Sequence, residues 1–263
     1  MSISTATEGI RFAVPPAFQI HRQVLAKDGV AGIRDYVTRV LGNRPPPAEG
    51  EADRNWSVQF RTLMVQGHLK NPGELVGVLR QSEVPALCRE ILGPGLVYSI
   101  DKSLLRDFNP RLRSAPATMH FDAHVFGPHI PIVTVWVPLN PVGVDAPGLA
   151  IATRPHWPLD YWNELAGRVD DAGLLYRRID PGRAGIPQDE IYALARAEDE
   201  WPLVEPVLDV GDVMIFDHQY IHGTQPGIAN PGRRMSMEVR VMPYAMAQRL
   251  LAAGLPQMFA SLD

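Results

Sequence analysis

Short apolar runs separated by turn residues dominate the chain after residue 95. Seven runs of five to ten residues are rich in β-branched or aromatic side chains, and glycine, proline, asparagine or aspartate bounds them. They cover residues 96–100, 119–126, 130–139, 148–153, 205–210, 212–216 and 234–242. Runs of this length and composition are typical of β-strands. Seven strands are enough for two packed sheets, so the pattern predicts a double-sheet barrel or jelly roll.

The first third of the chain carries a helical pattern instead. Apolar side chains recur every three or four residues in three segments, which predicts helices at 17–41, 56–68 and 72–92. A proline-rich stretch at 43–53 separates the first two, because proline cannot continue a helix or a central strand. We expect these helices, within residues 16–95, to form a layer outside the sheets.

The length and composition predict a single domain over residues 1–263. A chain of 263 residues with 46% hydrophobic residues can bury a full core. The expected β core covers 96–243 and is interrupted at 160–200 by an insertion of helical pieces and loop. Long insertions of this kind often form the wall of an active site. A C-terminal helix is expected at 244–263, which makes the fold mainly β with flanking helices.

The charge pattern narrows the class of partner. The net charge is −4, and the lysines and arginines are scattered rather than gathered in a basic stripe. We therefore expect a small-molecule substrate, with no nucleic-acid or membrane partner. No apolar stretch reaches the length of about 20 residues that a membrane span needs, and the amino terminus lacks the features of a signal peptide. Cys88 is the only cysteine, and we expect it to be buried. A single cysteine cannot form an internal disulfide, which fits a reducing compartment, so the sequence predicts a cytoplasmic protein.

His120 and Asp122 stand two residues apart on an expected strand. Alternate residues of a strand point to the same face, so both side chains can reach one metal ion. Such a pair arises easily by chance, and its weight depends on a further ligand. His222 supplies that ligand at the end of the apolar strand that begins near residue 212.

Two histidines and one carboxylate are the ligands of non-haem iron(II) oxygenases. They occupy one face of an octahedral ion and leave three positions for cosubstrate and oxygen. The residues therefore predict an iron(II) centre at His120, Asp122 and His222, although the same ligands also suit zinc. His124 and His218 share the faces of these ligands and are alternatives to them, which we interpret as neighbours of the metal rather than ligands.

Arg233 and Arg234 follow His222 by eleven and twelve residues, at the start of an expected strand. A dicarboxylic cosubstrate that chelates iron at one end needs a cation for its other carboxylate, which guanidinium binds through two hydrogen bonds. Strand alternation divides the segment into one face with Arg234, Ser236, Glu238 and Arg240 and another with Arg233, Met235, Met237 and Val239. Only one of the two arginines can therefore point inward.

In ordered segments between residues 96 and 243, the chain resembles the phytanoyl-CoA dioxygenase-like family of iron(II)/2-oxoglutarate oxygenases. The matching motifs are His-Phe-Asp at 120–122, Trp-Val-Pro-Leu at 136–139, Pro-Gly-Leu at 147–149, Gly-Asp at 211–212, Phe-Asp-His at 216–218, His-Gly-Thr at 222–224 and Arg-Arg at 233–234. The order and spacing of the motifs carry the resemblance. Family members often have Gly-Ser-His after the Leu of the third motif, whereas this chain has Thr-Arg-Pro-His at 153–156. The resemblance therefore does not predict the residues of the substrate pocket.

The resemblance implies a double-stranded β-helix (jelly roll, cupin-like) core, with Fe(II) on His120, Asp122 and His222 and with 2-oxoglutarate and O2 as cosubstrates. The family's cosubstrate arginine, eleven residues after the last histidine, falls on Arg233. Arg234 has support of its own, because it forms with Ser236 the Arg-x-Ser arrangement that related oxygenases use for the same carboxylate. The face of Arg233 is the more apolar and resembles a barrel interior, so we favour Arg233.

These residues predict an oxygenase that hydroxylates an unactivated C–H bond of a small, partly apolar metabolite and releases succinate and CO2. Trp157 and Trp162, beside the expected insertion, are candidates to line an apolar substrate pocket. Two other functions use the same fold. One is a zinc-dependent hydrolase with the same ligands, and the other is a catalytically silent β-barrel that binds a small molecule. The arginine pair argues against the silent barrel, which has no need of it.

Overall fold

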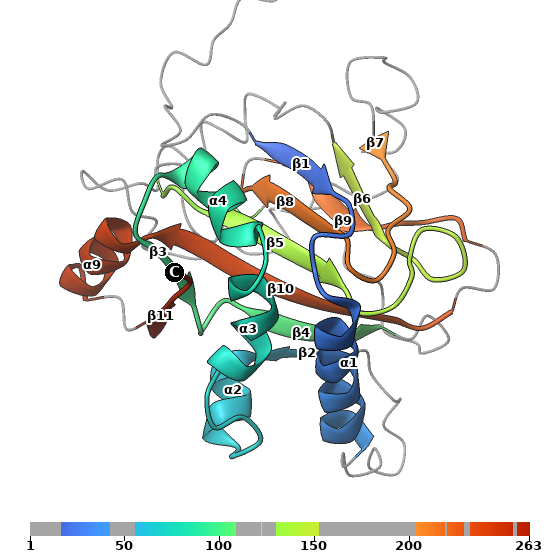
Figure 1. Cartoon of the computed structure of the whole chain (residues 1–263), viewed down its shortest axis with the longest axis horizontal. Coiled ribbons are helices and arrows are strands. Elements are labelled where there is room, and N and C mark those ends of the chain that lie inside the picture. Colours follow the sequence, from blue (N-terminus) through green and yellow to red (C-terminus); the bar gives the residue numbers. More distant parts are fainter. Residues whose placement is uncertain are drawn as a thin grey trace, which may run out of the picture.

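The structure is a computed structural model built around two sheets of antiparallel strands (Figure 1). It describes residues 17–42, 56–108, 122, 130–152, 203–218, 220–228, 232–254 and 257–263. The described strands are β1 (Phe18–His21), β2 (Trp56–Gln59), β3 (Leu96–Ser99), β4 (Leu104–Phe108), β5 (Val133–Pro138), β6 (Leu149–Ala152), β7 (Leu203–Val204), β8 (Val213–Asp217), β9 (His222–Thr224), β10 (Arg234–Pro243) and β11 (Phe259–Ser261). The described helices are α1 (Lys27–Gly42), α2 (Phe60–Val65), α3 (Gly73–Arg80), α4 (Val84–Leu92) and α9 (Tyr244–Ala252).

The strands form two sheets. The larger sheet has eight strands in the order β1-β8-β5-β10-β3-β11, with β4 pairing both β10 and β2, and the smaller sheet has the order β7-β6-β9. Strand β10 is central, because one of its edges pairs with β5 while the other pairs with β4 and then with β3. With partners on both edges and other elements over both faces, β10 is buried almost throughout.

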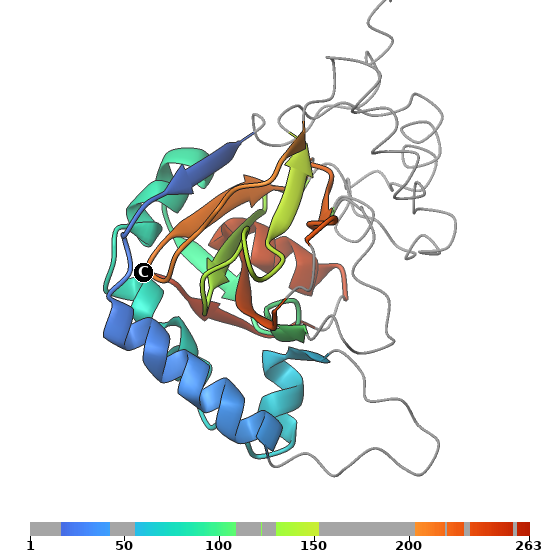
Figure 2. The same cartoon turned by 90° about the vertical axis from the view of Figure 1, so that its right-hand side faces the viewer.

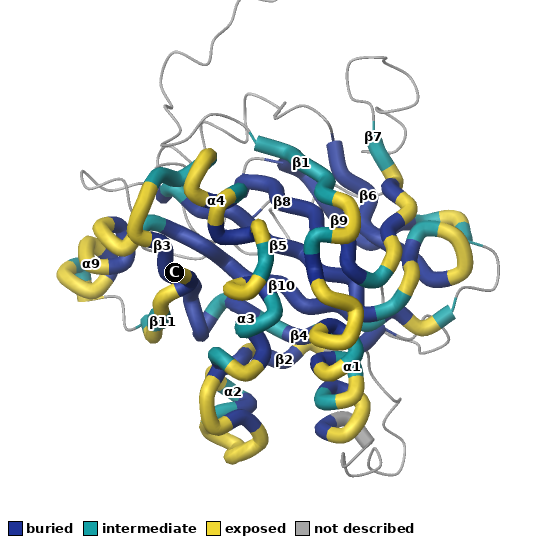
Figure 3. Tube along the Cα trace, in the orientation of Figure 1, coloured by how far each residue is buried: buried dark blue, intermediate teal, exposed yellow. Residues whose placement is uncertain are grey.

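The main apolar core fills the space between one face of the larger sheet and helices α1, α3 and α4 (Figure 2). The sheet contributes Val133, Val135 and Val137 from β5 and Met237, Val239 and Val241 from β10. The helices contribute Val30, Ile33 and Val37 from α1, Leu75, Val76 and Leu79 from α3, and Val84 and Cys88 from α4. The central strands are buried along their length, whereas each helix exposes its outer side (Figure 3).

The opposite face of the larger sheet packs towards the smaller sheet. Trp136 of β5 and Phe216 of β8 meet Leu149 and Ile151 of β6 there in a second apolar cluster. Residues of β5 therefore alternate between the two clusters, with the odd-numbered valines towards the helices and Trp136 towards the smaller sheet. A face buried by helices and a face buried by a second sheet together explain why β5 is apolar on both sides.

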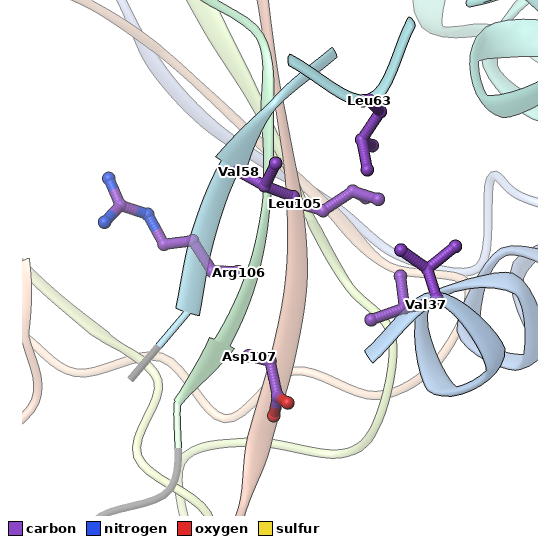
Figure 4. A pocket seen from close by; sticks show the side chains of 7 residues that line it. Val37, Val58, Leu63, Leu105, Arg106 and Asp107 are labelled. Carbon is purple, nitrogen blue, oxygen red and sulfur yellow. The ribbon is translucent and has the colours of Figure 1, made fainter. Parts of the chain in front are cut away.

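A small pocket marks where α1 and α2 meet the sheet (Figure 4). Leu105 of β4 points into this pocket towards Val37 and Leu63, while the next residue, Arg106, points to the other side of the strand (Figure 4). The alternation of β4 thus places an apolar side chain under the helices and a guanidinium on the face that meets the smaller sheet.

Replacing Leu105 by alanine is expected to lower the free energy of unfolding by about 3 kcal/mol, because the deletion enlarges a pocket that its neighbours cannot collapse to fill. Leu105 is 3% exposed. Val65→Ala is the matched control, since Val65 is 80% exposed on α2, and its effect should stay below about 0.5 kcal/mol. Chemical denaturation of the two variants measures both values, and equal losses would contradict this account of the core.

Two helix predictions in the first part of the chain are wrong at their starts. The predicted helix 17–41 begins only at Lys27, because Phe18–His21 form β1 on the edge of β8. The predicted helix 56–68 likewise opens with β2, which pairs with β4. Strand pairing depends on a partner distant in the sequence, so local periodicity does not reveal it.

The predicted helix 72–92 is two helices, α3 and α4. Ser82 lies between them, where its hydroxyl donates to the Leu79 carbonyl oxygen and accepts from the Val84 amide. Pro85 stands in the first turn of α4, the position where its missing N–H costs nothing. The C-terminal helix also differs from the prediction, because α9 ends at Ala252 and β11 then adds to the edge of the larger sheet.

Five of the seven predicted strands are confirmed, as β3, β5, β6, β8 and β10. Segment 205–210 contributes only a bridge between Leu208 and Val142. Segment 119–126 lies outside the described residues except for Asp122, and so do the insertion 160–200 and both Trp157 and Trp162. Within the described part of the chain, no helix combines the length and apolar character of a membrane span.

Candidate functional site

A small pocket lies between the two sheets, lined by residues from both of them. The larger sheet contributes Arg106, Trp136, Phe216, Arg234 and Glu238 to its lining, and the smaller contributes Leu149, His222, Gly223 and Thr224. Aromatic and aliphatic side chains form part of the wall, and charged groups form the rest. This combination is typical of a small-molecule site, where apolar walls surround a few orienting polar groups.

His222 opens strand β9, where it pairs with Ile151 of β6. The sequence predicted that the strand from residue 212 would continue to His222. The structure instead ends β8 at Asp217 and turns into the other sheet. Buried in that turn is His218, which is 1% exposed. His222 therefore enters the cavity from the opposite wall to β10.

The orientation of His222 is set by two contacts. Its Nδ1 is 3.0 Å from the carbonyl oxygen of Tyr220, and its ring centroid lies 4.7 Å from that of Phe216. A carbonyl oxygen only accepts, so Nδ1 carries the proton and Nε2 keeps its lone pair. Burial lowers the pKa of His222, and the charge of Asp122 partly opposes this shift. A neutral imidazole with a free Nε2 lone pair is the form that ligates a metal ion.

Asp122 is buried, with 5% of its surface exposed. Its Oδ2 accepts a hydrogen bond from Thr134 Oγ1 at 3.2 Å and forms an ion pair with Arg240, whose Nη2 lies 3.0 Å away. The structure thus brings Asp122 close enough to His222 for its charge to act on that imidazole. His120 and His124 fall outside the described residues, and within the described part no three acidic, histidine or cysteine side chains gather as potential metal ligands.

Arg234 points into the cavity and is 2% exposed. Its Nη1 donates to the carbonyl oxygen of Gly148 at 3.1 Å, and its guanidinium carbon lies 5.2 Å from the centroid of the Phe108 ring. Burial and the charge of Arg106 lower the pKa of Arg234 to about 10. At neutral pH the side chain is therefore still a cation inside a largely closed cavity.

Arg233 points to the opposite face of the strand. Its Nε and Nη2 are 2.5 and 2.6 Å from the two carboxylate oxygens of Asp107, and its side chain is 45% exposed. The expectation that the apolar face of β10 lines the interior site is wrong, because Met237 and Val239 pack under the helices. The polar face of β10 borders the cavity. The preference for Arg233 rested on the apolar face lining the interior site, so the structure does not support that argument.

A chain of buried charges continues along the polar face of β10. Glu238 accepts from Arg106 Nε at 2.5 Å and from Arg240 Nη2 at 3.3 Å. Burial alone raises the pKa of Glu238, but Arg106 and Arg240 together lower it to about 2. Each of these charges has a partner of opposite sign, as burial of ionised groups requires.

Five polar atoms between the two sheets have no hydrogen-bond partner within the described part of the chain. They are Nε of Arg234, Oγ of Ser236, Oγ1 of Thr224, Nε1 of Trp136 and Nη1 of Arg240. Buried polar groups in folded proteins are nearly always satisfied, so each of these needs a partner from elsewhere. Their neighbourhood fits a bound ligand that supplies several acceptor atoms.

Arg106 and Thr134 are not among the site residues that the sequence predicted, and Glu238 and Arg240 had no predicted role. For β10 a signal was present, because charged residues at every second position of an otherwise apolar strand indicate a polar interior face. Arg106 had no comparable signal. It joins Glu238 across 132 residues of sequence, a contact that only the pairing of β4 with β10 creates.

Comparison with solved structures identifies the fold. SnoK, a non-heme alpha ketoglutarate dependent carbocyclase from nogalamycin biosynthesis, gives a TM-score of 0.57 at 16% identity over 91% of this chain and 85% of that chain. AviO1 from Streptomyces viridochromogenes Tue57 gives 0.56 at 20% identity over 88% of this chain and 91% of its own. The epimerase SnoN gives 0.54 at 20% identity over 87% and 79%. The chain therefore has the jelly-roll fold of these proteins.

Sequence comparison with curated proteins gives a more particular likeness. The 1-deoxypentalenic acid 11-beta-hydroxylases of Streptomyces exfoliatus and Streptomyces arenae are each 32% identical to this chain over 127 residues. The match covers 48% of this chain and 40% of each relative, so it spans less than half the length of either. No protein-family model matches the chain.

Proposed function

We propose that this protein is an Fe(II)/2-oxoglutarate-dependent oxygenase of the phytanoyl-CoA dioxygenase-like kind, which hydroxylates a small, partly apolar metabolite in the cytoplasm. The observation that carries the proposal is one cavity that holds a candidate metal-ligating histidine and a buried, protonated arginine. His222 and Asp122, with His120, would hold the metal. Together the metal and 2-oxoglutarate would supply the oxidising chemistry, with succinate and CO2 as products.

The residues present fit a dianionic cosubstrate. Arg234 and the unpartnered oxygens of Ser236 and Thr224 offer donors for one carboxylate, and guanidinium is the side chain best suited to bind it bidentately. We therefore assign the distal carboxylate of 2-oxoglutarate to Arg234 rather than to Arg233. Among the charges in and beside the cavity, the three cations of Arg106, Arg234 and Arg240 exceed the two anions of Asp122 and Glu238 by one, which favours an anionic ligand.

The apolar wall supports a partly apolar substrate. Trp136, Phe216 and Leu149 would contact it and exclude water from the metal side of the cavity. The curated relatives are hydroxylases named for 1-deoxypentalenic acid, and SnoK and SnoN come from nogalamycin biosynthesis. Each name points to a small organic molecule. We extend the class, not the individual compound, to this chain.

The domain organisation is part of the proposal. We propose that residues 1–263 form one domain, with a double-stranded β-helix core and helices α1 to α4 as an outer layer. The contacts of α1, α3 and α4 with the larger sheet support this arrangement.

Anaerobic addition of Fe(II) and 2-oxoglutarate to metal-free protein tests the proposal. We expect the weak visible charge-transfer band of an iron-chelated keto acid, which appears only when both components are present. Zn(II) with 2-oxoglutarate is the control and should give no band. Tight zinc retention without the band in the iron sample would support a hydrolase instead, and binding of neither metal would support a non-catalytic binding protein.

A further inference from the structure

We propose that Arg240 is a positioning residue that fixes the carboxylate of Asp122 for metal binding, and that Glu238 cancels the charge of Arg240 so that this contact does not weaken the metal site. The inference rests on the proposed function, since it concerns the same metal site, and it adds two residues to which no role has been assigned. It follows from the buried contacts along the polar face of β10.

Arg240 and Thr134 hold the same oxygen of Asp122. They lie opposite each other on the paired strands β10 and β5. Arg240 forms an ion pair with Oδ2 at 3.0 Å, and Thr134 donates a hydrogen bond to the same oxygen at 3.2 Å. Two contacts from a rigid sheet to one oxygen fix the orientation of the carboxylate that would help to hold the metal.

Arg240 is itself held in place from two sides. Its backbone amide donates to Ser103 Oγ at 3.1 Å, and its Nη2 lies 3.3 Å from Glu238 Oε2. Glu238 is fixed in turn by Arg106, which reaches both of its oxygens. The side chain of Arg240 is 6% exposed. If it turned out into solvent, the carboxylates of Asp122 and Glu238 would lose a buried partner of opposite charge.

The signs of the charges explain why Glu238 is needed. A cation paired with a metal ligand repels the bound dication and draws electron density from the carboxylate. In this chain the charges alternate through Asp122, Arg240, Glu238 and Arg106, and the four together are neutral. Removing Glu238 would leave an uncompensated guanidinium beside the metal, at an interior site where screening by water is weak.

Titration of metal-free protein with Co(II), followed by calorimetry, tests the inference without relying on catalysis. We expect Arg240→Gln and Glu238→Gln each to weaken Co(II) binding by about 10- to 100-fold, as loss of groups that orient metal ligands does. Because Glu238 acts through Arg240, its substitution should add less than about threefold in the Arg240→Gln background. Arg240→Lys, which keeps the charge and a donor, should bind Co(II) more tightly than Arg240→Gln.

Arg61→Gln is the matched control. It removes a half-exposed guanidinium that pairs with Asp101 at 2.7 Å and does not line the cavity, and it should leave the Co(II) affinity unchanged. Unchanged affinity in folded Arg240→Gln, or full additivity in the double variant, would overturn the inference. If Arg240→Gln does not fold, Arg240→Lys and Glu238→Gln decide, and wild-type affinity in both overturns it. Wild-type protein that binds no Co(II), or binds it equally well as His222→Ala, would overturn the proposed function instead.

Discussion

Replacing Arg234 by glutamine is expected to weaken 2-oxoglutarate binding by about 100- to 1000-fold, the equivalent of about 3 to 4 kcal/mol. The substitution removes the buried cation of the cavity and with it two charge-assisted hydrogen bonds to a carboxylate, each of which is strong in a water-excluded site. Arg234→Lys should recover only part of the loss, because an ammonium keeps the charge but not the paired geometry. Equilibrium titration of the metal-loaded protein with 2-oxoglutarate, without oxygen, measures the dissociation constants.

Arg233→Gln is the control that the chain itself provides. It is a neighbouring residue of the same type, but its guanidinium pairs with Asp107 and is 45% exposed. We expect its dissociation constant for 2-oxoglutarate to stay within about threefold of the wild type, with a modest loss of stability of about 1 kcal/mol from the broken ion pair. The reverse result, a large loss for Arg233→Gln and a small one for Arg234→Gln, would return the cosubstrate to Arg233.

His222→Ala and Asp122→Ala are each expected to lower metal affinity by at least about 1000-fold, or about 4 kcal/mol, and to abolish succinate formation. Either change would leave the ion with two protein ligands instead of three, because it removes the oriented lone pair of His222 or the fixed carboxylate of Asp122. Calorimetric titration with Co(II) and assays of succinate release measure the two effects. Near-wild-type turnover in either variant would refute the metal assignment.

His218→Ala separates the proposed ligand from its alternative. His218 lies in the turn after β8, four residues before His222, and is equally buried. If His218 only packs beside the site, its loss should lower the free energy of unfolding. The metal affinity should stay within about threefold of the wild type, because a side chain that does not bind the metal contributes little to its affinity. A loss of affinity as large as that of His222→Ala would make His218 a ligand.

Local sequence was sufficient for the strands that pack on both sides. Segment 130–139, and segment 212–216 after its first residue, are almost entirely apolar or β-branched, and they became β5 and β8 of the larger sheet. Burial on both faces demands this composition wherever the strand lies. Segments 18–21 and 56–59 are strands for a different reason, namely that β8 and β4 offer them open edges. The local sequence of a segment does not predict this pairing, because the edge that it pairs with belongs to a strand distant in the sequence.

The candidate site divides in the same way. The sequence predicted the types of residue in the site, namely the carboxylate of Asp122, the imidazole of His222 and one of the guanidinium groups of Arg233 and Arg234. These types indicated a metal ion and an anionic cosubstrate. Strand alternation also predicted correctly that Arg234, Ser236, Glu238 and Arg240 share a face. Strand alternation sorts the residues of a strand into two faces, but it does not tell which face packs against the helices and which against the second sheet.

The tertiary structure made that decision. Helices α1, α3 and α4 cover the apolar face of β10, so the cavity lies on the face of Arg234. The structure also joined Arg106 to Glu238 and Arg240 to Asp122, contacts between residues 132 and 118 positions apart. The sequence by itself therefore determined the kinds of strand and the kinds of ligand, since both depend on single side chains. Which arginine enters the cavity, and which charges pair there, depended on sheet pairing and on the elements packed over each face.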